Sequence, residues 1–194
     1  MSYELVNPNI DTELYTRIEL GPLDMNNDIY VNLKYNLKKK VLGKCNKHGY
    51  VMQVHQILEY ENGIIEAENS NCSSIFDIKY SAKICILNEN IKLVAKIIRM
   101  NKILILLTNG PILIIVKTSD LNKEIFNIGE NNEIYHGDKV QLVVDNYVVV
   151  NITAQKFSVG DKNIKAMGHI EQMAKINEID TMYFDYKILD NFNV

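Results

Sequence analysis

The sequence predicts an α+β unit built from a strand, a helix and a sheet, followed by an all-β barrel. Three observations support this. Apolar residues recur every four positions over 29–41, which indicates a helix, and alternate strictly over 76–86, which indicates a long strand. Beyond residue 91 only short apolar runs separated by turn signals follow. We expect boundaries of 1–86 for the first unit, 87–170 for the barrel and 171–194 for an acidic C-terminal tail.

The charge balance excludes a protein that coats nucleic acid by bulk charge. The 194 residues carry a net charge of −3. The charges are unevenly placed, with six lysines and no acid over 29–58 and five acids against two lysines from 168 to the end. A basic patch on a mildly acidic protein therefore remains open. The enrichment in Ile, Asn and Lys is typical of an A/T-rich genome, such as that of a large DNA virus.

Cysteine usage and the N-terminus indicate an intracellular protein. Three irregularly spaced cysteines fit a reducing compartment better than a disulfide framework. The N-terminus, "MSYELVNPNI", has no secretory pattern, and the most apolar segment, "ILILLTNGPILIIV", is short and interrupted. We expect no membrane span.

The first unit contains the clearest elements. Residues 1–12 are expected to be a loosely held arm, and "ELYTRIEL" a strand that ends at Gly21-Pro22. Asn26 or Asn27 can cap the helix, and Gly43 ends it. From Tyr50 the period is two, and the two strands predicted there are separated by the turn signal Glu61-Asn62-Gly63. One face of the first of these strands should hold Tyr50, Met52, Val54, Leu58 and Tyr60, and the other Gln53 and His55.

Two local features have a structural and a functional interpretation. Lys38, Lys39 and Lys40 fall in the last helical turn, where positive charges interact favourably with the negative end of the helix dipole. Alternatively, the three lysines form a binding patch. Cys45 and His48 have the spacing of two of the four ligands of a zinc site, or they could pair as a catalytic nucleophile and its base. A buried Cys and a surface His explain them better, because a structural zinc site needs four ligands and the spacing alone does not show that the two side chains are in contact. Gly43-Lys44 also lacks the other residues of a phosphate-binding loop. We expect no metal, no cofactor and no catalytic residue.

The pattern of strands in the second half of the sequence predicts a small Greek-key barrel of the OB-fold type, a fold that can bind single-stranded RNA. Its five strands are expected at 91–100, 102–108, 112–118, 139–154 and 163–170, with a long link over 119–136 and a short helix over 171–179. The cations that could contact RNA are Lys96, Arg99, Lys102 and Lys117. Aromatic stacking platforms are missing from the first three strands, and only Tyr147 and Phe157 could partly substitute for them.

The order of these parts resembles the larger stalk subunit of multi-subunit DNA-dependent RNA polymerases, the family that includes the seventh subunit of eukaryotic polymerase II and its archaeal counterpart. The resemblance covers roughly residues 13–170. The matching stretches are "KVLGKCNKHGYVMQVHQI", "FDIKYSAKI", "TNGPILIIVKT", and "HGDKVQLVV" with "IKAMGHI". Within them, the family's motif residues match Gly43, Cys45, Gly49, Tyr50, Val51, Gly110, Pro111, Gly137 and Asp138. The chain departs from the family at residues 87–90 and near Lys102, both in the part expected to meet RNA.

The resemblance implies a non-catalytic subunit that acts in transcription initiation. Its tip domain, residues 1–86, would dock on the polymerase core, formed by the two largest subunits and a small core subunit. We expect a smaller helical stalk partner, nascent RNA at the barrel, and a location in the nucleus, or in host cytoplasm or virion for a viral protein. Docking is assigned to Gly21, Pro22, Asn62 and Gly63 of the tip loops, and to Lys38, Lys39 and Lys40.

Two other function classes stay open. One is a free-standing RNA-binding OB-fold protein, for example a translation or RNA-processing factor, which would bind RNA with a steep salt dependence. The other is a hydrolase that uses Cys45 and His48, for which the sequence offers no substrate pocket.

Overall fold

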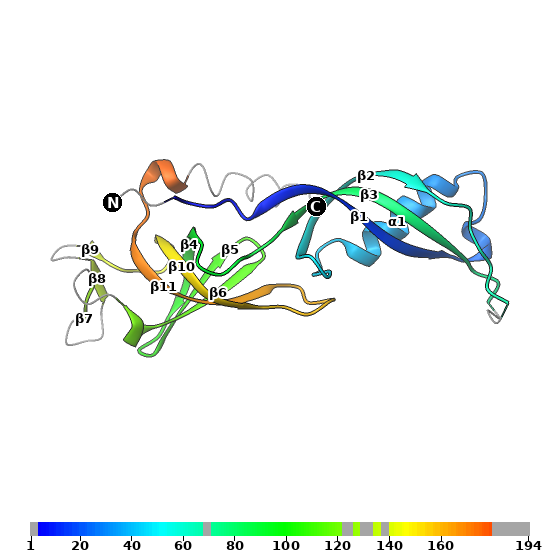
Figure 1. Cartoon of the computed structure of the whole chain (residues 1–194). Coiled ribbons are helices and arrows are strands. Elements are labelled where there is room, and N and C mark those ends of the chain that lie inside the picture. Colours follow the sequence, from blue (N-terminus) through cyan, green and yellow to red (C-terminus); the bar gives the residue numbers. More distant parts are fainter. Residues whose placement is uncertain (1–3, 68–70, 122–125, 129–133, 137–139, 180–194) are drawn as a thin grey trace. The chain divides into compact units, whose positions relative to one another are not determined.

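The computed structural model describes residues 4–67, 71–121, 126–128, 134–136 and 140–179 (Figure 1). The chain divides into two compact units. Residues 9–86 together with 158–162 form one, which we call the sheet unit. The described parts of residues 1–8, 87–157 and 163–194 form the other, the barrel unit.

The sheet unit is a three-stranded antiparallel sheet with one α-helix packed on it. Its strand order is β1-β3-β2, so β1 and β2 are both edge strands. The elements in chain order are β1 (Asn9–Leu20), the 3-10 helix η1 (Pro22–Asp24), α1 (Ile29–Val41), β2 (Tyr50–Tyr60) and β3 (Ser74–Cys85).

Helix α1 forms where the four-residue spacing predicts it. Leu33 and Leu37 are fully buried against the sheet. Gly43 ends the helix in the left-handed conformation, with φ 73°, which glycine adopts at little cost. At the other end Asp28 is the N-cap residue without a side-chain cap. The Asn26 side chain instead accepts a hydrogen bond from the Asp28 N–H at 2.9 Å, which orders the turn before the helix.

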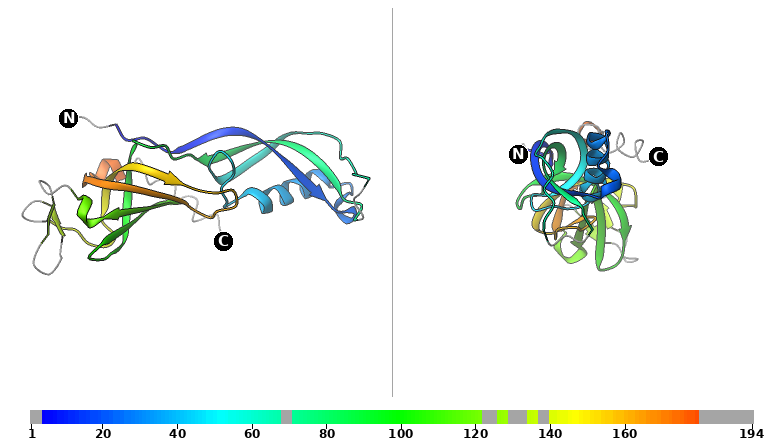
Figure 2. Two further views of the ribbon diagram at one scale, coloured as in Figure 1. Left: turned by 60° about the horizontal axis from the view of Figure 1, so that its bottom comes forward. Right: turned by 90° about the vertical axis from the view of Figure 1, so that its right-hand side faces the viewer.

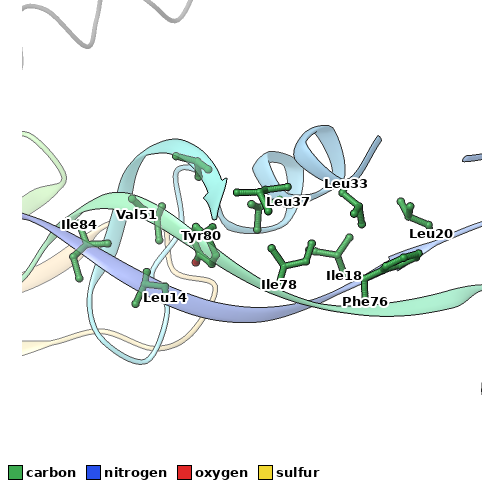
Figure 3. Close-up of a cluster of buried hydrophobic side chains, with 13 residues drawn as sticks. Leu14, Ile18, Leu20, Leu33, Leu37, Val51, Phe76, Ile78, Tyr80 and Ile84 are labelled. Atoms are coloured by element: carbon green, nitrogen blue, oxygen red, sulfur yellow. The ribbon is translucent and has the colours of Figure 1, made fainter. Parts of the chain in front are cut away.

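The core of the sheet unit lies between α1 and the sheet (Figure 3). Strand β3 supplies its inner row with the predicted alternation, while its outward residues are partly or fully exposed except for Cys85 at its end, which is buried. The thirteen buried members are Leu14, Ile18, Leu20, Leu33, Leu37, Val51, Val54, Ile57, Phe76, Ile78, Tyr80, Ala82 and Ile84. Apolar burial of this kind, worth ~25 cal/mol per Å², holds the helix to the sheet.

Two predictions about the edge strands are wrong. Strand β1 begins at Asn9 inside the predicted arm, because β3 is long enough to pair with it as far as Cys85. Strand β2 does not alternate: Val51, Val54 and Ile57 are its buried residues, at a spacing of three. Three register shifts against β3 cause this, since each β-bulge adds one residue and turns the next side chain over.

The barrel unit contains a closed five-stranded barrel of order β4-β5-β6-β11-β10 (Figure 2). Strands β6 and β11 are parallel, and the other neighbours are antiparallel. This arrangement fits the predicted OB-fold barrel. The strands are β4 (Lys92–Met100), β5 (Leu104–Asn109), β6 (Ile112–Lys117), β10 (Tyr147–Lys156) and β11 (Ile164–Met173).

The link between β6 and β10 departs from the prediction. It holds the 3-10 helix η2 (Thr118–Asp120) and a small sheet of β7 (Phe126–Ile128), β8 (Ile134–His136) and β9 (Val140–Gln141). The single strand expected over 139–154 is split, because a turn at Asp145, with φ 76°, separates β9 from β10. Asp tolerates this left-handed conformation better than most residues. Gly137 and Asp138 lie outside the described residues.

The C-terminal region also differs from the prediction. Residues 171–173 belong to β11, and only a helical turn at 176–179 remains of the helix expected over 171–179. Residues 180–194 of the predicted tail lie outside the described residues. No helix in the described part of the chain is long and apolar enough to cross a membrane.

Candidate functional site

The loops that follow β1 and β2 lie at the same end of the sheet (Figure 1). Leu20, the last residue of β1, is opposite Ser74 at the start of β3. Beyond β2, Ile64 pairs with Ile75 through two backbone hydrogen bonds of 2.9 Å. Since neighbouring strands are ~4.8 Å apart, the chain at Leu20 and the chain at Ile64 are about 10 Å from each other.

We call residues 21–24 and 61–65 the tip loops. They contain the four residues predicted to dock there: Gly21, Pro22, Asn62 and Gly63. The structure therefore brings these four together, although their role in docking stays a prediction. The β1 loop is rigid for local reasons, because Pro22 opens η1 with a fixed φ and the Asp24 N–H donates to the Gly21 carbonyl at 3.0 Å.

The tip loops also present apolar side chains that the sequence analysis missed. Leu23 is 92% exposed, Ile64 64% and Ile65 56%. Exposed aliphatic side chains that gather at one end of a unit are typical of a protein interface. The signal was readable in the sequence, where "GPL" and "NGII" place apolar residues directly after turn residues.

Gly21 and Gly63 have different structural roles. A Cβ added at Gly21 would meet no atom within 4 Å, so that position has free space. A Cβ added at Gly63 would collide with the Ser74 hydroxyl and the Phe76 ring. The backbone of the second loop therefore lies directly against side chains at the start of β3, and any side chain at position 63 would have to displace them.

The structure does not bring the lysine cluster to the tip loops. Lys38, Lys39 and Lys40 are exposed at the end of α1, and ~14 Å of helix axis separates Lys38 from the helix start beside η1. Lys40 Nζ donates to the Arg17 carbonyl at 2.6 Å. This bond satisfies one backbone group on the edge strand β1. The predicted docking residues thus form two surfaces of the sheet unit.

Cys45 and His48 do not form a catalytic pair. Cys45 is buried and His48 is exposed in a turn that the Asn46 side chain holds through the N–H groups of His48 and Gly49, at 2.7 and 2.9 Å. Burial, reinforced by the Asp161 carboxylate, raises the pKa of the Cys45 thiol to about 11. A thiol with this pKa is a weak nucleophile at neutral pH. Within the described residues, no three His, Cys, Asp or Glu side chains gather as metal ligands.

The four predicted RNA-contacting cations lie on strands and loops of the barrel. Lys96 forms an ion pair with Asp145 at 2.6 Å, and the hydrogen bond to that carboxylate raises the pKa of Lys96. The Lys102 backbone lies beside Thr118, the residue after Lys117, because the Thr118 hydroxyl donates to the Lys102 carbonyl at 2.8 Å. Arg99 is exposed on β4. The pairing with Asp145 sets Lys96 apart from the other three.

Aliphatic residues separate these cations on the outside of the barrel. Leu106 is opposite both Arg99 and Ile115, and Ile115 is opposite Met167. Leu104, the neighbour of Leu106 on the same face, is opposite Lys117. We call Leu104, Leu106, Ile115 and Met167 the outer strip. The sequence analysis missed it, because the parallel pairing of β6 with β11 is a tertiary contact.

Comparison with known proteins gives one informative similarity. No protein-family model matches the chain. The chain is similar to a protein of Acanthamoeba polyphaga mimivirus named "Putative DNA-directed RNA polymerase subunit". The two sequences are 27% identical over 183 residues, which cover 94% of this chain and 92% of the mimivirus protein. The similarity therefore extends over both the sheet unit and the barrel unit.

Proposed function

We propose that the protein is a non-catalytic subunit of a DNA-directed RNA polymerase. The observation that carries this proposal is the similarity to the mimivirus protein over 94% of the chain. The closed barrel and its strand order support the proposal, because they agree with the OB-fold expected from the resemblance to stalk subunits. Such a subunit acts inside the cell as part of a larger complex.

We further propose that it occupies the stalk position and docks on the polymerase core through the tip loops. Leu23, Ile64 and Ile65 provide the apolar contact area for such docking. Full burial of one such side chain stabilises an interface by ~1.5–3 kcal/mol. The partners in this arrangement are the two largest subunits, a small core subunit and a smaller helical stalk protein, with nascent RNA near the barrel.

The test is co-purification of the tagged chain with polymerase from its native source. We expect the wild-type chain to recover the two largest subunits in near-stoichiometric amounts. The double variant Leu23→Asp/Ile64→Asp should lower this recovery at least about tenfold, because two carboxylates would be buried at the contact. Val159→Asp, at an exposed apolar residue outside the tip loops, is the matched control and should leave recovery unchanged.

The possible outcomes separate the two parts of the proposal. Equal recovery by the double variant and the control would exclude the tip loops as the docking surface. Recovery of RNA or ribosomal proteins by the wild-type chain, without polymerase subunits, would instead favour a free-standing RNA-binding protein. Circular dichroism spectra and melting temperatures of the variants check that each one is folded.

A further inference from the structure

The outer strip is an apolar surface on the outside of a closed barrel. Its residues alternate along β5 and β6 with Ile105, Leu107, Ile114 and Val116, which are fully buried inside. Leu104 is 41% exposed and Met167 46%. Ile103, in the preceding loop, is 73% exposed and extends the strip at its end. A band of aliphatic side chains that crosses β5, β6 and β11 is therefore exposed to solvent.

A shallow pocket of about 200 Å³ opens within this surface. Its lining residues are Arg99, Asn101, Leu104, Ile105, Leu106 and Ile115. This volume is below the ~300–1,000 Å³ that is usual for small-molecule sites. The pocket suits one aliphatic side chain of a larger partner, with the Arg99 guanidinium at its rim.

Four cations surround the strip, and the described residues offer them no acidic partner. Arg99 lies beside Leu106, Lys117 is opposite Leu104, and Lys102 precedes Ile103 in the loop before β5. Lys165 is opposite Leu113, two pairs along from the Ile115–Met167 pair. In the described part of the chain the ion pairs of the barrel join Lys92 and His169 to Glu171 and Lys96 to Asp145, so none involves these four cations.

The chemistry of this surface favours a polypeptide over RNA. Base stacking on aromatic side chains contributes ~1–3 kcal/mol per base to single-strand binding. Strands β4, β5, β6 and β11 contain no Phe, Tyr or Trp. An aliphatic partner would instead gain ~25 cal/mol for each Å² of apolar surface that it buries on the strip. Carboxylates on the same partner would complement the surrounding cations.

We propose that the outer strip binds an acidic segment of a partner polypeptide that carries Leu, Ile or Val side chains between its carboxylates. One aliphatic side chain enters the pocket beside Arg99, and neighbouring carboxylates pair with Arg99, Lys102 and Lys117. The surface and its occupant are defined by the barrel alone, so this proposal does not depend on docking through the tip loops.

The experiment measures binding of labelled probes to the full chain by fluorescence anisotropy. The test probe is an eight-residue peptide of alternating Asp and Leu. Its controls are the alternating Asp/Ser peptide, which keeps the charge, the alternating Lys/Leu peptide, which keeps the apolar side chains, and a ten-nucleotide oligouridylate. We expect the Asp/Leu peptide to bind at least about tenfold more tightly than each control.

Variants assign the binding to the strip. Arg99→Glu/Lys117→Glu and, separately, Met167→Asp should each weaken binding of the Asp/Leu peptide at least about tenfold. Lys47→Glu, a charge reversal at an exposed lysine of the sheet unit, should leave it unchanged. The altered side chains are exposed, so the fold should persist, and melting temperatures check this.

Three results would overturn the proposal. Equal binding of the Asp/Leu and Asp/Ser peptides would show that the aliphatic strip is not used. Tighter binding of the oligouridylate, weakened by the same variants, would assign the surface to RNA. No measurable binding of the Asp/Leu peptide would remove the acidic polypeptide as the occupant. None of these results bears on recovery of polymerase through the tip loops.

Discussion

Cys45 stabilises the fold through its backbone and stays chemically inert through its environment. Its N–H donates to the Asp161 carbonyl and its carbonyl accepts from the Gly160 N–H, both at 2.8 Å. Burial of the thiol disfavours the thiolate, and the Asp161 carboxylate disfavours it further, so both raise the pKa. The residue that the sequence offers as a candidate nucleophile therefore connects two segments of the sheet unit.

This environment predicts slow alkylation of Cys45. A rise in thiol pKa from 9.0 to about 11 lowers the thiolate fraction at pH 8 about 100-fold, before any steric protection. In the native chain we expect iodoacetamide to modify the exposed Cys72 first and to leave Cys45 and Cys85, both buried, largely unmodified. Mass spectrometry of tryptic peptides over time measures the order. Modification of Cys45 as fast as in urea-unfolded chain would contradict the burial.

The same pKa shift predicts how the free energy of unfolding changes with pH. Because the folded-state pKa is raised, the thiol contributes stability that is fully present below pH 9 and is lost as pH rises towards 11. The Cys45→Ala variant removes this contribution, so its free energy of unfolding should fall less between pH 9 and pH 11 than that of the wild type. Urea unfolding at the two pH values measures the difference, and equal falls for the two chains would contradict the raised pKa.

At the scale of elements, the loops and bulges decide which residues reach the surface. The bulges of β2 place Val51, Val54 and Ile57 inward, where strict alternation would have placed Met52 and Leu58. The two tip loops also differ from each other in how closely their glycines approach other atoms. The loop after β1 has open space around Gly21, whereas the loop after β2 lies against β3 at Gly63.

This difference predicts opposite outcomes for the same substitution. Gly63→Ala should lower the free energy of unfolding by about 1–3 kcal/mol, because its Cβ would overpack against Ser74 and Phe76. Gly21→Ala should change stability by less than about 0.5 kcal/mol, since φ at Gly21 is −71° and the space is free. Urea unfolding of both variants measures this, and similar values for the two would contradict the close approach at Gly63.

At the scale of the whole molecule, the two units arrange their exposed charges and apolar side chains differently. The sheet unit holds exposed apolar residues in the tip loops and its lysine cluster at the end of α1. In the barrel unit the cations Arg99, Lys102, Lys117 and Lys165 surround the aliphatic outer strip. Within the described residues, the tip loops, the lysine cluster and the outer strip are therefore three candidate surfaces for assembly, each with its own chemistry.

The lysine cluster should act through long-range attraction if it takes part in docking, as the resemblance implies. Reversing Lys38, Lys39 and Lys40 to Glu should weaken association with the polymerase core several-fold near 0.05 M salt. The difference should vanish near 0.5 M salt, because screening shortens the reach of exposed charges. The triple Gln variant, which removes the charge without reversing it, should give an intermediate effect. Equal affinities of the three chains at low salt would exclude a docking role for the cluster.

The elements that depend on local pattern could be predicted from the amino-acid sequence alone. Helix α1 follows from four apolar residues at a spacing of four and from Gly43, and β3 follows from its alternation. The first three barrel strands follow from apolar runs bounded by turn residues. The connections at Gly21 and Gly63 could be predicted as well, because Gly-Pro and Asn-Gly have strong turn preferences.

Features that depend on pairing between distant segments required the tertiary structure. Asn9 begins a strand because β3 extends far enough to pair with it, and β2 is bulged because its register on β3 shifts three times. The outer strip exists because β11 lies parallel to β6, which places Met167 beside Ile115. Local sequence sets periods and turns, whereas the packing of each whole unit sets strand register and strand order, and with them the surfaces that the strands create.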